Sequence, residues 1–511
     1  MVELNMVETK KVCIIGLDGV GLHNIRLFLN KLPLNNISKI INKGFSSTFS
    51  SIPPYTPSAW TSIFTGVNPG KHGIYGFYKV IKNKNKNFTV TLASSYDIKY
   101  PRIFEMLTMF NMKSVIINVP LVYPVHGLIG LKNVIVVSDW ASPSQFIHPK
   151  SYDSKYKEYL VNPPHNWSLA TDNKKYAYKV EEFLKTRINM YYDLLEQENY
   201  NLFIVVFSEL DWLMHRIPEI INGKEISYVS KILSIIDTFI HRAINTCNMV
   251  ILVSDHGFTT AQTIVSINRI LYENKLIAFK YKLNFGKLLN KSTFLAQASS
   301  DNENSTISHK FSKIINMAIN NTVNMLKKVV PSGILMKIAP IIPISMEIDY
   351  SRSSAFMLET GNWGVYVKDE YITMVKSLLK HVKYIKKITY GRNIFWGRYA
   401  NLAPDLILIP QSDVIFDTRI YAEPVYSKFV GEHDTHALIA FYGDNVVPGN
   451  EVNVTMYDIV PTVLSYLGLP LPHDSDGRPL IELINIDDFI LKDKFNYSSR
   501  FKIMRKIKDV I

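Results

Sequence analysis

The sequence predicts an α/β fold in which a central, mostly parallel sheet lies between layers of helices. Short β-branched runs alternate with segments of helical period, which is the pattern of parallel strands joined by crossover helices. Several of these runs are continuously apolar, as is typical of strands buried on both faces. The chain has 511 residues, 47% of them hydrophobic, so it can bury a large core.

The elements follow in chain order. The predicted strands are Lys11–Leu17, Lys113–Val119, Leu202–Phe207, Met249–Ser254, Asp405–Ile409 and Ala437–Phe441. Helices are predicted where apolar residues recur at three and four positions, as in Tyr176–Glu198 and Ile226–Ala243.

This alternation stops between about Lys275 and Glu347. There Ser299–Ser308 is typical of a loop, and Lys310–Lys328 of an amphipathic helix. We therefore expect a core in two parts, 1–274 and 348–488, with an inserted, mainly helical cap at 275–347. A basic C-terminal tail, 489–511, has no chemistry assigned to it.

The net charge is +13, from 57 Lys plus Arg against 44 Asp plus Glu. This excess favours anionic ligands such as phosphates, although a Lys-rich surface also serves solubility. Outside the short tail no stripe of Lys and Arg with interleaved aromatic residues is evident, so no specific nucleic-acid binding is expected.

Cys13 and Cys247 lie in or beside apolar runs, and we expect reduced, buried thiols rather than a disulfide scaffold. Met1–Lys11 is polar, which argues against a secretory signal. Val329–Met346 is apolar but contains Lys337 and falls short of a spanning helix; peripheral membrane contact is its secondary interpretation. A cytoplasmic protein without a transmembrane segment is predicted.

Asp18 directly follows the first predicted strand. Its carboxylate would lie at the carboxyl end of a buried strand, where an α/β sheet opens onto its ligand crevice. A dinucleotide-binding turn over Gly16, Gly19 and Gly21 is the alternative. The spacing does not fit that fingerprint, and an Asp there would repel a pyrophosphate unless a metal lay between them.

Thr56 stands before Pro57, and Gly66 ends the same segment, which predicts a helix with Thr56 as its N-cap. A cap is the simplest role for this residue. A hydroxyl at a helix N-terminus also lies among unpaired backbone N–H groups, in a field that suits a phosphoryl group. A nearby metal would lower its pKa and make it a nucleophile, so we expect Thr56 to act as both.

Asp211 and His215 are spaced to project from one face of a helical turn after a strand. One carboxylate oxygen and one imidazole nitrogen could then reach the same zinc, although a plain ion pair has the same spacing. Glu209 is expected on the opposite side.

Asp255 and His256 end a strand of almost pure Val, Ile and Leu. Burying two polar groups there without partners would cost free energy of desolvation, and a bound metal would offset that cost. A hydrogen-bonded structural pair is the alternative.

Together these motifs resemble the alkaline phosphatase superfamily, and within it the type I phosphodiesterase and nucleotide pyrophosphatase branch, particularly its prokaryotic members. Later segments agree with this resemblance, which runs from about Lys11 to Leu480 and places seven motifs in order. The segments that carry it are Asp18-Gly19, Thr56–Ile74, Asp211–His215, Asp255–Gly257, Gly431–Ala440, Asp458–Pro470 and Asp476–Arg478.

The resemblance implies an alkaline phosphatase-like fold and two divalent metal ions, most often Zn²⁺, with Mn²⁺ as the alternative. One metal is assigned to Asp211, His215 and His433, and the other to Asp18, Asp255 and His256, with Thr56 between them. His433 falls on the family's Gly-x-His register, whereas the nearby His436 does not. His72 matches a position that is more often structural.

The implied activity is hydrolysis of phosphodiester or pyrophosphate bonds in a small, nucleotide-like substrate through a phosphothreonine intermediate. A phosphomonoesterase of the same superfamily is the alternative enzyme, and an inactive anion-binding member is the alternative outside enzymes. The sequence sets neither the oligomeric state nor the metal used in the cell.

One departure concerns the third phosphate oxygen. Nucleotide pyrophosphatases carry an Asn shortly after the His-Gly segment, and Ile74–Tyr78 contains none. The substrate-binding residues are therefore left open. Tyr75, Phe77 and Tyr78 would either stack against a base or belong to the core.

Overall fold

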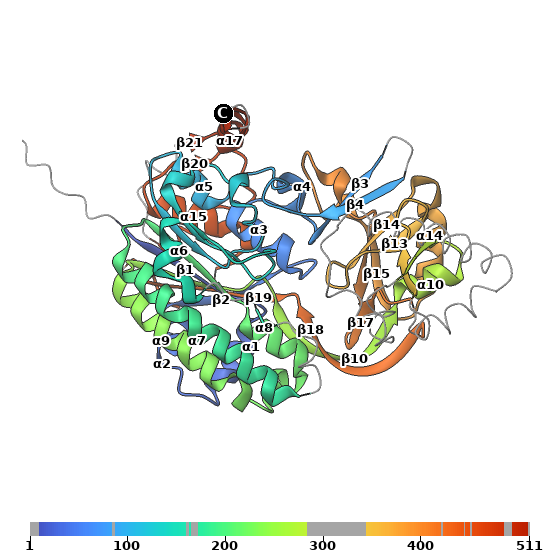
Figure 1. Cartoon of the computed structure of the whole chain (residues 1–511), viewed down its shortest axis with the longest axis horizontal. Coiled ribbons are helices and arrows are strands. Elements are labelled where there is room, and N and C mark those ends of the chain that lie inside the picture. The colour runs from blue at the N-terminus through green and yellow to red at the C-terminus, as the bar shows by residue number, and fades with distance from the viewer. Residues whose placement is uncertain are drawn as a thin grey trace, which may run out of the picture.

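The computed structural model describes residues 10–83, 87–159, 163–164, 172–283, 344–420, 423–443, 445–449, 452–484 and 493–508. Most of the expected cap lies outside these residues, including Ser299–Ser308 and Lys310–Lys328, and so does most of Val329–Met346. Figure 1 shows a larger lobe and a smaller lobe, with two long strands, β10 (Gly257–Ser266) and β18 (Val425–Asp434), running between them.

The larger lobe is built on a mixed sheet of eight strands. Its five middle strands, from β9 to β6, run parallel, and β2, β19 and β7 run antiparallel to their neighbours. The mostly parallel central sheet is confirmed. In spatial order the strands are β2 (Phe45–Ser50), β19 (His436–Gly443), β9 (Met249–Val253), β1 (Val12–Leu17), β8 (Leu202–Phe207), β5 (Ser114–Ile117), β6 (Val134–Val137) and β7 (Ile147–His148).

Helices cover both faces of this sheet because each buried strand sends alternate side chains to opposite sides. Along β1, Cys13, Ile15 and Leu17 belong to one apolar core, and Val12 and Ile14 belong to the other. The first core is shared with α1 (Leu22–Leu29), α2 (Asn35–Lys43), α7 (Asn173–Gln197) and α9 (Ser227–Thr246). The second is shared with α3 (Thr56–Thr65), α5 (Ile103–Thr108) and α15 (Ile459–Tyr466).

The smaller lobe has its own apolar core and its own sheets. One is antiparallel, in the order β13 (Ala355–Met357), β14 (Gly364–Val367), β16 (Leu406–Pro410) and β15 (Ile385–Tyr390). Another joins β17 (Val414–Asp417), β10 and β18. Among the described residues this lobe also contains two strand pairs and two α-helices: β3 (Tyr78–Lys82) with β4 (Phe88–Leu92), β11 (Phe279–Leu283) with β12 (Ile344–Ile348), α10 (Ile267–Glu273) and α14 (Ile372–Lys380).

The strand predicted at Asp405–Ile409 exists as β16, but it lies in this antiparallel sheet and not in the central one. The expectation was wrong on that point. A short apolar run identifies a buried strand, but it carries no information about which sheet the strand joins.

Cys13 and Cys247 form a disulfide, so the expectation of reduced thiols is wrong. The two residues are 234 positions apart in the sequence, but Cys13 lies on β1 and Cys247 lies two residues before the neighbouring strand β9. The cytoplasmic location, which rested partly on those thiols, stays a prediction.

The basic C-terminal segment contains strand β21 (Lys494–Phe495), paired with β20 (Leu471–Pro472), and helix α17 (Tyr497–Lys508). Arg505 on α17 donates hydrogen bonds to the carbonyls of Ser95, Tyr96, Ile98 and Gly127. Among the helices of the described ranges, none has the length and apolar content needed to cross a bilayer.

Candidate metal centre and active site

Three adjacent parallel strands end at the same edge of the central sheet. In the order β9, β1, β8 they are followed by Asp255, by Asp18 and by Ser208 with helix α8 (Glu209–Arg216). Because the carboxyl ends of parallel strands share an edge, segments more than 200 residues apart deliver polar side chains to one place.

The first group of candidate ligands is Asp18, Asp255 and His256, all of them buried. The Nε2 atom of His256 lies 3.2 Å from Oδ2 of Asp255 and 3.8 Å from Oδ1 of Asp18. Ser208 Oγ donates to Oδ2 of Asp18 at 2.8 Å, and the backbone N–H of Gly19 donates to Asp255 Oδ1 at 3.2 Å. Asp18 Oδ2 and Asp255 Oδ1 are therefore held by hydrogen bonds, whereas Asp18 Oδ1 and Asp255 Oδ2 receive none from a described residue.

Gly19 is needed for this arrangement. Its φ of +75° is strained for any other residue, and an added Cβ would lie 2.6 Å from the ring of Phe258. The turn after β1 therefore brings a backbone N–H to Asp255 in a way that only glycine permits.

The second group is Asp211, His215 and His433. Oδ1 of Asp211 lies 3.6 Å from Nε2 of His215 and 3.5 Å from Nε2 of His433, and these two Nε2 atoms are 2.9 Å apart. Asp211 and His215 project from α8, as the spacing predicted, and His433 comes from β18. Asp211 Oδ1 is also buried without a hydrogen-bond partner in the described chain.

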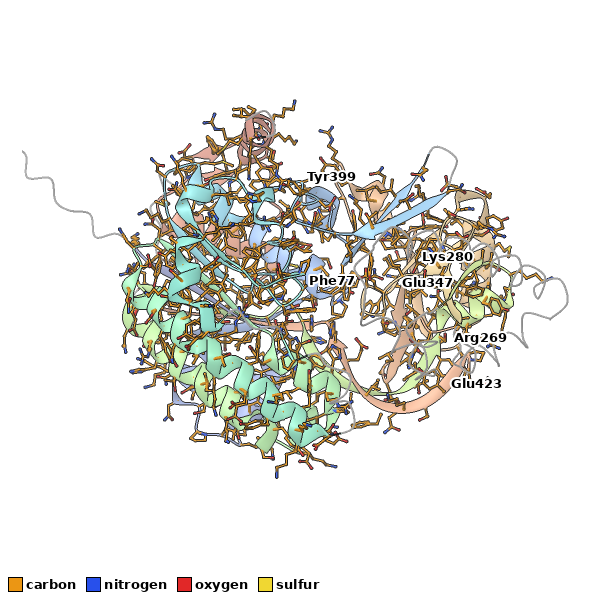
Figure 2. All side chains as sticks on the ribbon, viewed as in Figure 1. Phe77, Arg269, Lys280, Glu347, Tyr399 and Glu423 are labelled. Carbon is orange, nitrogen blue, oxygen red and sulfur yellow. A yellow bond between two sulfur atoms is a disulfide. The ribbon has the colours of Figure 1, made fainter. Side chains whose placement is uncertain are left out.

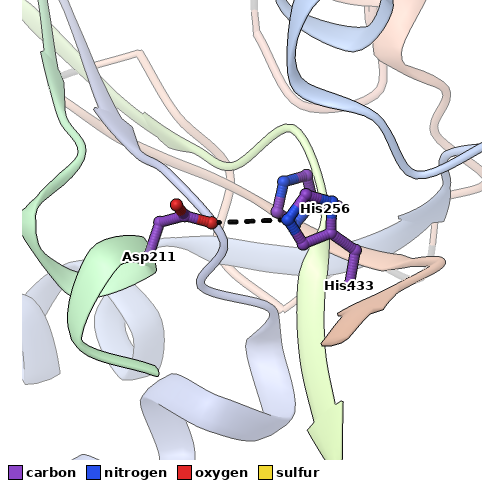
Figure 3. A group of neighbouring side chains, drawn as sticks. All are labelled: Asp211, His256 and His433. Atoms are coloured by element: carbon purple, nitrogen blue, oxygen red, sulfur yellow. Dashed lines mark ion pairs between the residues drawn. The ribbon is translucent and has the colours of Figure 1, made fainter. Parts of the chain in front are cut away.

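The two groups adjoin. The rings of His256 and His433 stack with centroids 3.6 Å apart, and one candidate ligand set consists of Asp211, His256 and His433 (Figure 3). His256 therefore lies within reach of both positions.

All three imidazoles are held by the same kind of contact. Their Nδ1 atoms face backbone carbonyls, of Gly431 for His215, of Gly257 for His256 and of Pro54 for His433, at 3.3, 3.0 and 2.8 Å. A carbonyl oxygen only accepts, so each Nδ1 carries a proton, and in the neutral ring the lone pair is then on Nε2. This is the tautomer that metal-ligating histidines adopt, with the backbone fixing the ring. Three such nitrogens, together with three buried carboxylate oxygens that have no hydrogen-bond partner among the described residues, fit a pair of divalent cations.

The electrostatics of the cluster point the same way. Burial raises the pKa of Asp18 to about 7, and the nearby Asp211 carboxylate adds to the effect. Burial and the Asp18 carboxylate raise the pKa of Asp255 well above its usual range. Burial would also raise the pKa of Asp211, but His215 and His433 outweigh it and hold that pKa at about 2. A bound cation would stabilise all three carboxylates in their charged form.

Thr56 lies beside this cluster. It is the first residue of α3, is 5% exposed, and its Oγ1 is 3.4 Å from Nε2 of His256. The predicted role as N-cap is wrong by one residue: Tyr55 is the N-cap and makes no side-chain cap hydrogen bond. The Thr56 hydroxyl is thus not used to cap the helix, and Gly66 ends the helix as expected.

The structure thus brings together all seven residues selected from the sequence: Asp18, Thr56, Asp211, His215, Asp255, His256 and His433. His436 stays outside, where its exposed ring pairs with Asp434. His72 is buried, with its Nε2 3.0 Å from Ser62 Oγ. Glu209 is buried too, and it is absent from both ligand groups.

A cavity of about 860 Å³ opens beside the second ligand group. His215 and His433 line it from the larger lobe, and Leu358 to Gly361 line it from the smaller one. Phe77 and Tyr78 also line it, and Figure 2 shows Phe77 at the junction of the lobes. Tyr75 instead belongs to the core, where it packs on Phe395.

Sequence reasoning missed several residues of this region. Glu359 accepts hydrogen bonds from the Tyr55 hydroxyl at 2.8 Å and from the Phe77 N–H at 3.0 Å, and burial raises its pKa to about 7. Ser208 and Asp139 follow strands β8 and β6 at the same edge of the sheet as the candidate ligands. Each is a polar residue just after an apolar strand, so the pattern that selected Asp18 and Asp255 could have found them too. Glu359 lies just after β13 in the other lobe and had no such signal.

The model of the type I phosphodiesterase / nucleotide pyrophosphatase family matches residues 12–383. A search of curated proteins found no significant match. Among solved structures, phosphonoacetate hydrolase from Sinorhizobium meliloti 1021 is similar, with a TM-score of 0.54, 12% identity, and coverage of 90% of this chain and 96% of that one.

Murine ectonucleotide pyrophosphatase / phosphodiesterase 5 is similar with a TM-score of 0.51, 12% identity and coverage of 91% and 98%. The alkaline phosphatase PafA is similar with a TM-score of 0.52, 14% identity and coverage of 94% and 100%. At these identities the likeness establishes an alkaline phosphatase-like fold and nothing finer.

Proposed function

The chain belongs to the type I phosphodiesterase / nucleotide pyrophosphatase family, which is a family of phosphohydrolases, and from this premise we propose its activity. It hydrolyses phosphodiester or pyrophosphate bonds of small, nucleotide-like substrates. Thr56 is the nucleophile, and two divalent ions assist it. The observation that carries the proposal is the convergence of three imidazole Nε2 atoms and three carboxylates on one edge of the sheet, 3.4 Å from the Thr56 hydroxyl at the nearest contact.

The ligand sets we propose are Asp18, Asp255 and His256 for one ion and Asp211, His215 and His433 for the other. Mixed carboxylate and imidazole donors suit Zn²⁺, with Mn²⁺ as the alternative. When bound, the ions would lower the pKa of the attacking hydroxyl and stabilise charge on the entering and leaving oxygens.

The protein residues supply the rest of the chemistry. Thr56 Oγ1 loses its proton to solvent and attacks phosphorus, and the bond to the leaving alcohol or phosphate breaks as that group takes up a proton, which gives a phosphothreonine. Water then loses a proton and attacks the phosphorus, the bond to Oγ1 breaks, and Thr56 regains its proton. The N-terminus of α3 places its unpaired backbone N–H groups and positive field at the phosphoryl group. Backbone carbonyls hold the three imidazole rings in place throughout.

The test compares hydrolysis of bis-p-nitrophenyl phosphate with that of p-nitrophenyl phosphate by the zinc- and manganese-loaded protein. We expect the diester to be preferred. Thr56→Ala should lower kcat by roughly a thousandfold or more, because loss of a nucleophile removes the covalent path, whereas Thr56→Ser retains the hydroxyl and should keep measurable turnover. A marked monoester preference would favour a phosphomonoesterase, and a protein that purifies without metal and hydrolyses neither ester would favour an inactive anion-binding member.

A further inference from the structure

Helix α17 carries two apolar strips, and only one of them is buried against the larger lobe. Tyr497 and Phe501, four residues apart, are buried. Ile503 and Ile507, also four residues apart, are 50% and 54% exposed. Residues four apart share a face of a helix, so these isoleucines form a second strip, separate from the first. The packing of the helix on the larger lobe does not use this second strip.

The exposed side of α17 is also basic. The sequence of the helix contains Lys and Arg but no Asp or Glu. Arg505 and Lys508 are directed inward, where they donate hydrogen bonds to backbone carbonyls of the larger lobe. Arg500, Lys502 and Lys506 are exposed. By helical spacing, Arg500 lies on one side of the isoleucine strip and the two lysines lie on the other.

The contacts of α17 with the larger lobe hold this side outward. The helix follows strand β21, which pairs with β20, and Arg505 bonds to four carbonyls. Figure 1 shows α17 at the outer end of the larger lobe, away from the smaller lobe. The basic and apolar side is therefore presented on a helix that is already folded and anchored.

From this surface we infer that α17 docks the protein reversibly on a lipid bilayer that contains anionic lipids. Ile503 and Ile507 enter the boundary between headgroups and acyl chains, and Arg500, Lys502 and Lys506 meet the anionic headgroups on both sides. Reversible attachment of this kind needs an apolar contact together with a basic patch, and α17 supplies both. The inference is independent of the proposed function.

Other occupants fit this side of the helix less well. A second copy of the chain would place one basic helix against another, and like charges repel. A 12-residue helix is about 18 Å long, so one of its sides offers much less than the roughly 800 Å² per partner of a stable protein interface. Nucleic acid would satisfy the cations through its phosphates but offers no apolar layer to the isoleucines. A bilayer satisfies both groups.

The experiment is co-sedimentation of the full chain with lipid vesicles. One set of vesicles contains phosphatidylcholine alone, and the other contains phosphatidylcholine mixed with phosphatidylglycerol. We expect the partition coefficient to be on the order of a hundredfold higher for the mixed vesicles, because each of three exposed cations contributes about fivefold. Raising the salt concentration should weaken this binding, because salt screens exposed charges.

A first pair of variants tests the apolar strip. Ile503→Ser combined with Ile507→Ser should lower the partition coefficient on mixed vesicles by about tenfold or more, because the apolar area that enters the bilayer is lost. The matched control is Tyr178→Ser combined with Met374→Ser, which removes two similarly exposed side chains from α7 and α14. The control should bind as the wild type does.

A second pair tests the charge. Lys502→Glu combined with Lys506→Glu should abolish the preference for the mixed vesicles. Its matched control is Lys380→Glu combined with Lys387→Glu, which changes the net charge equally at two exposed residues of the smaller lobe. This control should retain the preference. All four variants alter exposed side chains, so each should unfold thermally at close to the wild-type temperature, which confirms that it is folded.

Several outcomes would overturn the inference. One is a wild-type protein that fails to bind the mixed vesicles or binds both kinds equally. Another is binding that neither pair of α17 variants weakens, because a different surface would then be responsible. Loss of binding in the lysine variant alone, with the isoleucine variant binding as the wild type does, would indicate a purely electrostatic contact of the kind nucleic acid makes, and would overturn it too.

Discussion

The proposed metal centre and the cavity beside it share His215 and His433 but are built in opposite ways. Most of the metal centre's polar groups follow three strands of one sheet, and its imidazoles are fixed by backbone carbonyls. The cavity has aromatic walls contributed by both lobes. In the proposed function the sheet would fix the position of the reaction and the cavity would receive the organic group of the substrate, so we expect the two regions to respond to different mutations.

The largest expected effect comes from removing a proposed metal ligand. His433→Ala removes an Nε2 donor that lies 3.5 Å from Asp211, so metal content should fall from two ions towards one per chain. Activity should fall by more than the roughly 10–100-fold that is typical of a lost outer-shell partner. Metal analysis and diester turnover measure both. His436→Ala, three residues away on an exposed ring, is the matched control and should alter neither; equal losses in the two variants would contradict the ligand assignment.

A smaller effect is expected from a mutation in the cavity wall. Trp140→Leu removes an aromatic side chain of the cavity wall. The Trp140 ring packs on the rings of Phe77 and Trp212, and neither of these is a proposed metal ligand. KM for bis-p-nitrophenyl phosphate should rise by roughly threefold to tenfold, since an aromatic ring pair contributes about 0.5–1.5 kcal/mol. Metal content and kcat should stay near the wild-type values. A fall in kcat with unchanged KM would show that the two regions are not separable.

The smallest effect concerns His72, which lies outside both regions. Burial lowers its pKa to about 3, so the unfolded chain binds the proton more tightly and stability falls as pH decreases from about 6.5 toward 3. His72→Asn retains an acceptor for the Ile74 N–H and removes this titration. Below pH 6.5 the wild type should therefore lose stability relative to the variant by about 1.4 kcal/mol per pH unit. Thermal unfolding at pH 7.5 and pH 5.5 measures it; parallel shifts in the two proteins would contradict a buried neutral His72.

The same contrast explains what could be predicted from the sequence. Asp18, Asp211 and Asp255 each follow a continuous apolar run, and parallel strands share a ligand edge, so a local pattern sufficed to bring them together. The family resemblance added His433, which comes from a strand that also joins the smaller lobe.

The cavity wall could not be predicted in this way. Glu359 meets Tyr55 and Phe77 across 304 and 282 residues, through the packing of one lobe on the other, and no local pattern encodes that contact. Similarly, β16 was recognised as a strand but assigned to the wrong sheet, and the Cys13–Cys247 bond was missed because strand order, not sequence, brings the two together.

The most direct test of the central claim is anomalous diffraction from crystals of the zinc-loaded protein. The account predicts two zinc peaks about 4 Å apart, the separation usual for two-metal phosphoryl-transfer sites, one among Asp18, Asp255 and His256 and one among Asp211, His215 and His433, with Thr56 Oγ1 facing both. Zinc peaks at other positions, or none at these six side chains, would contradict it.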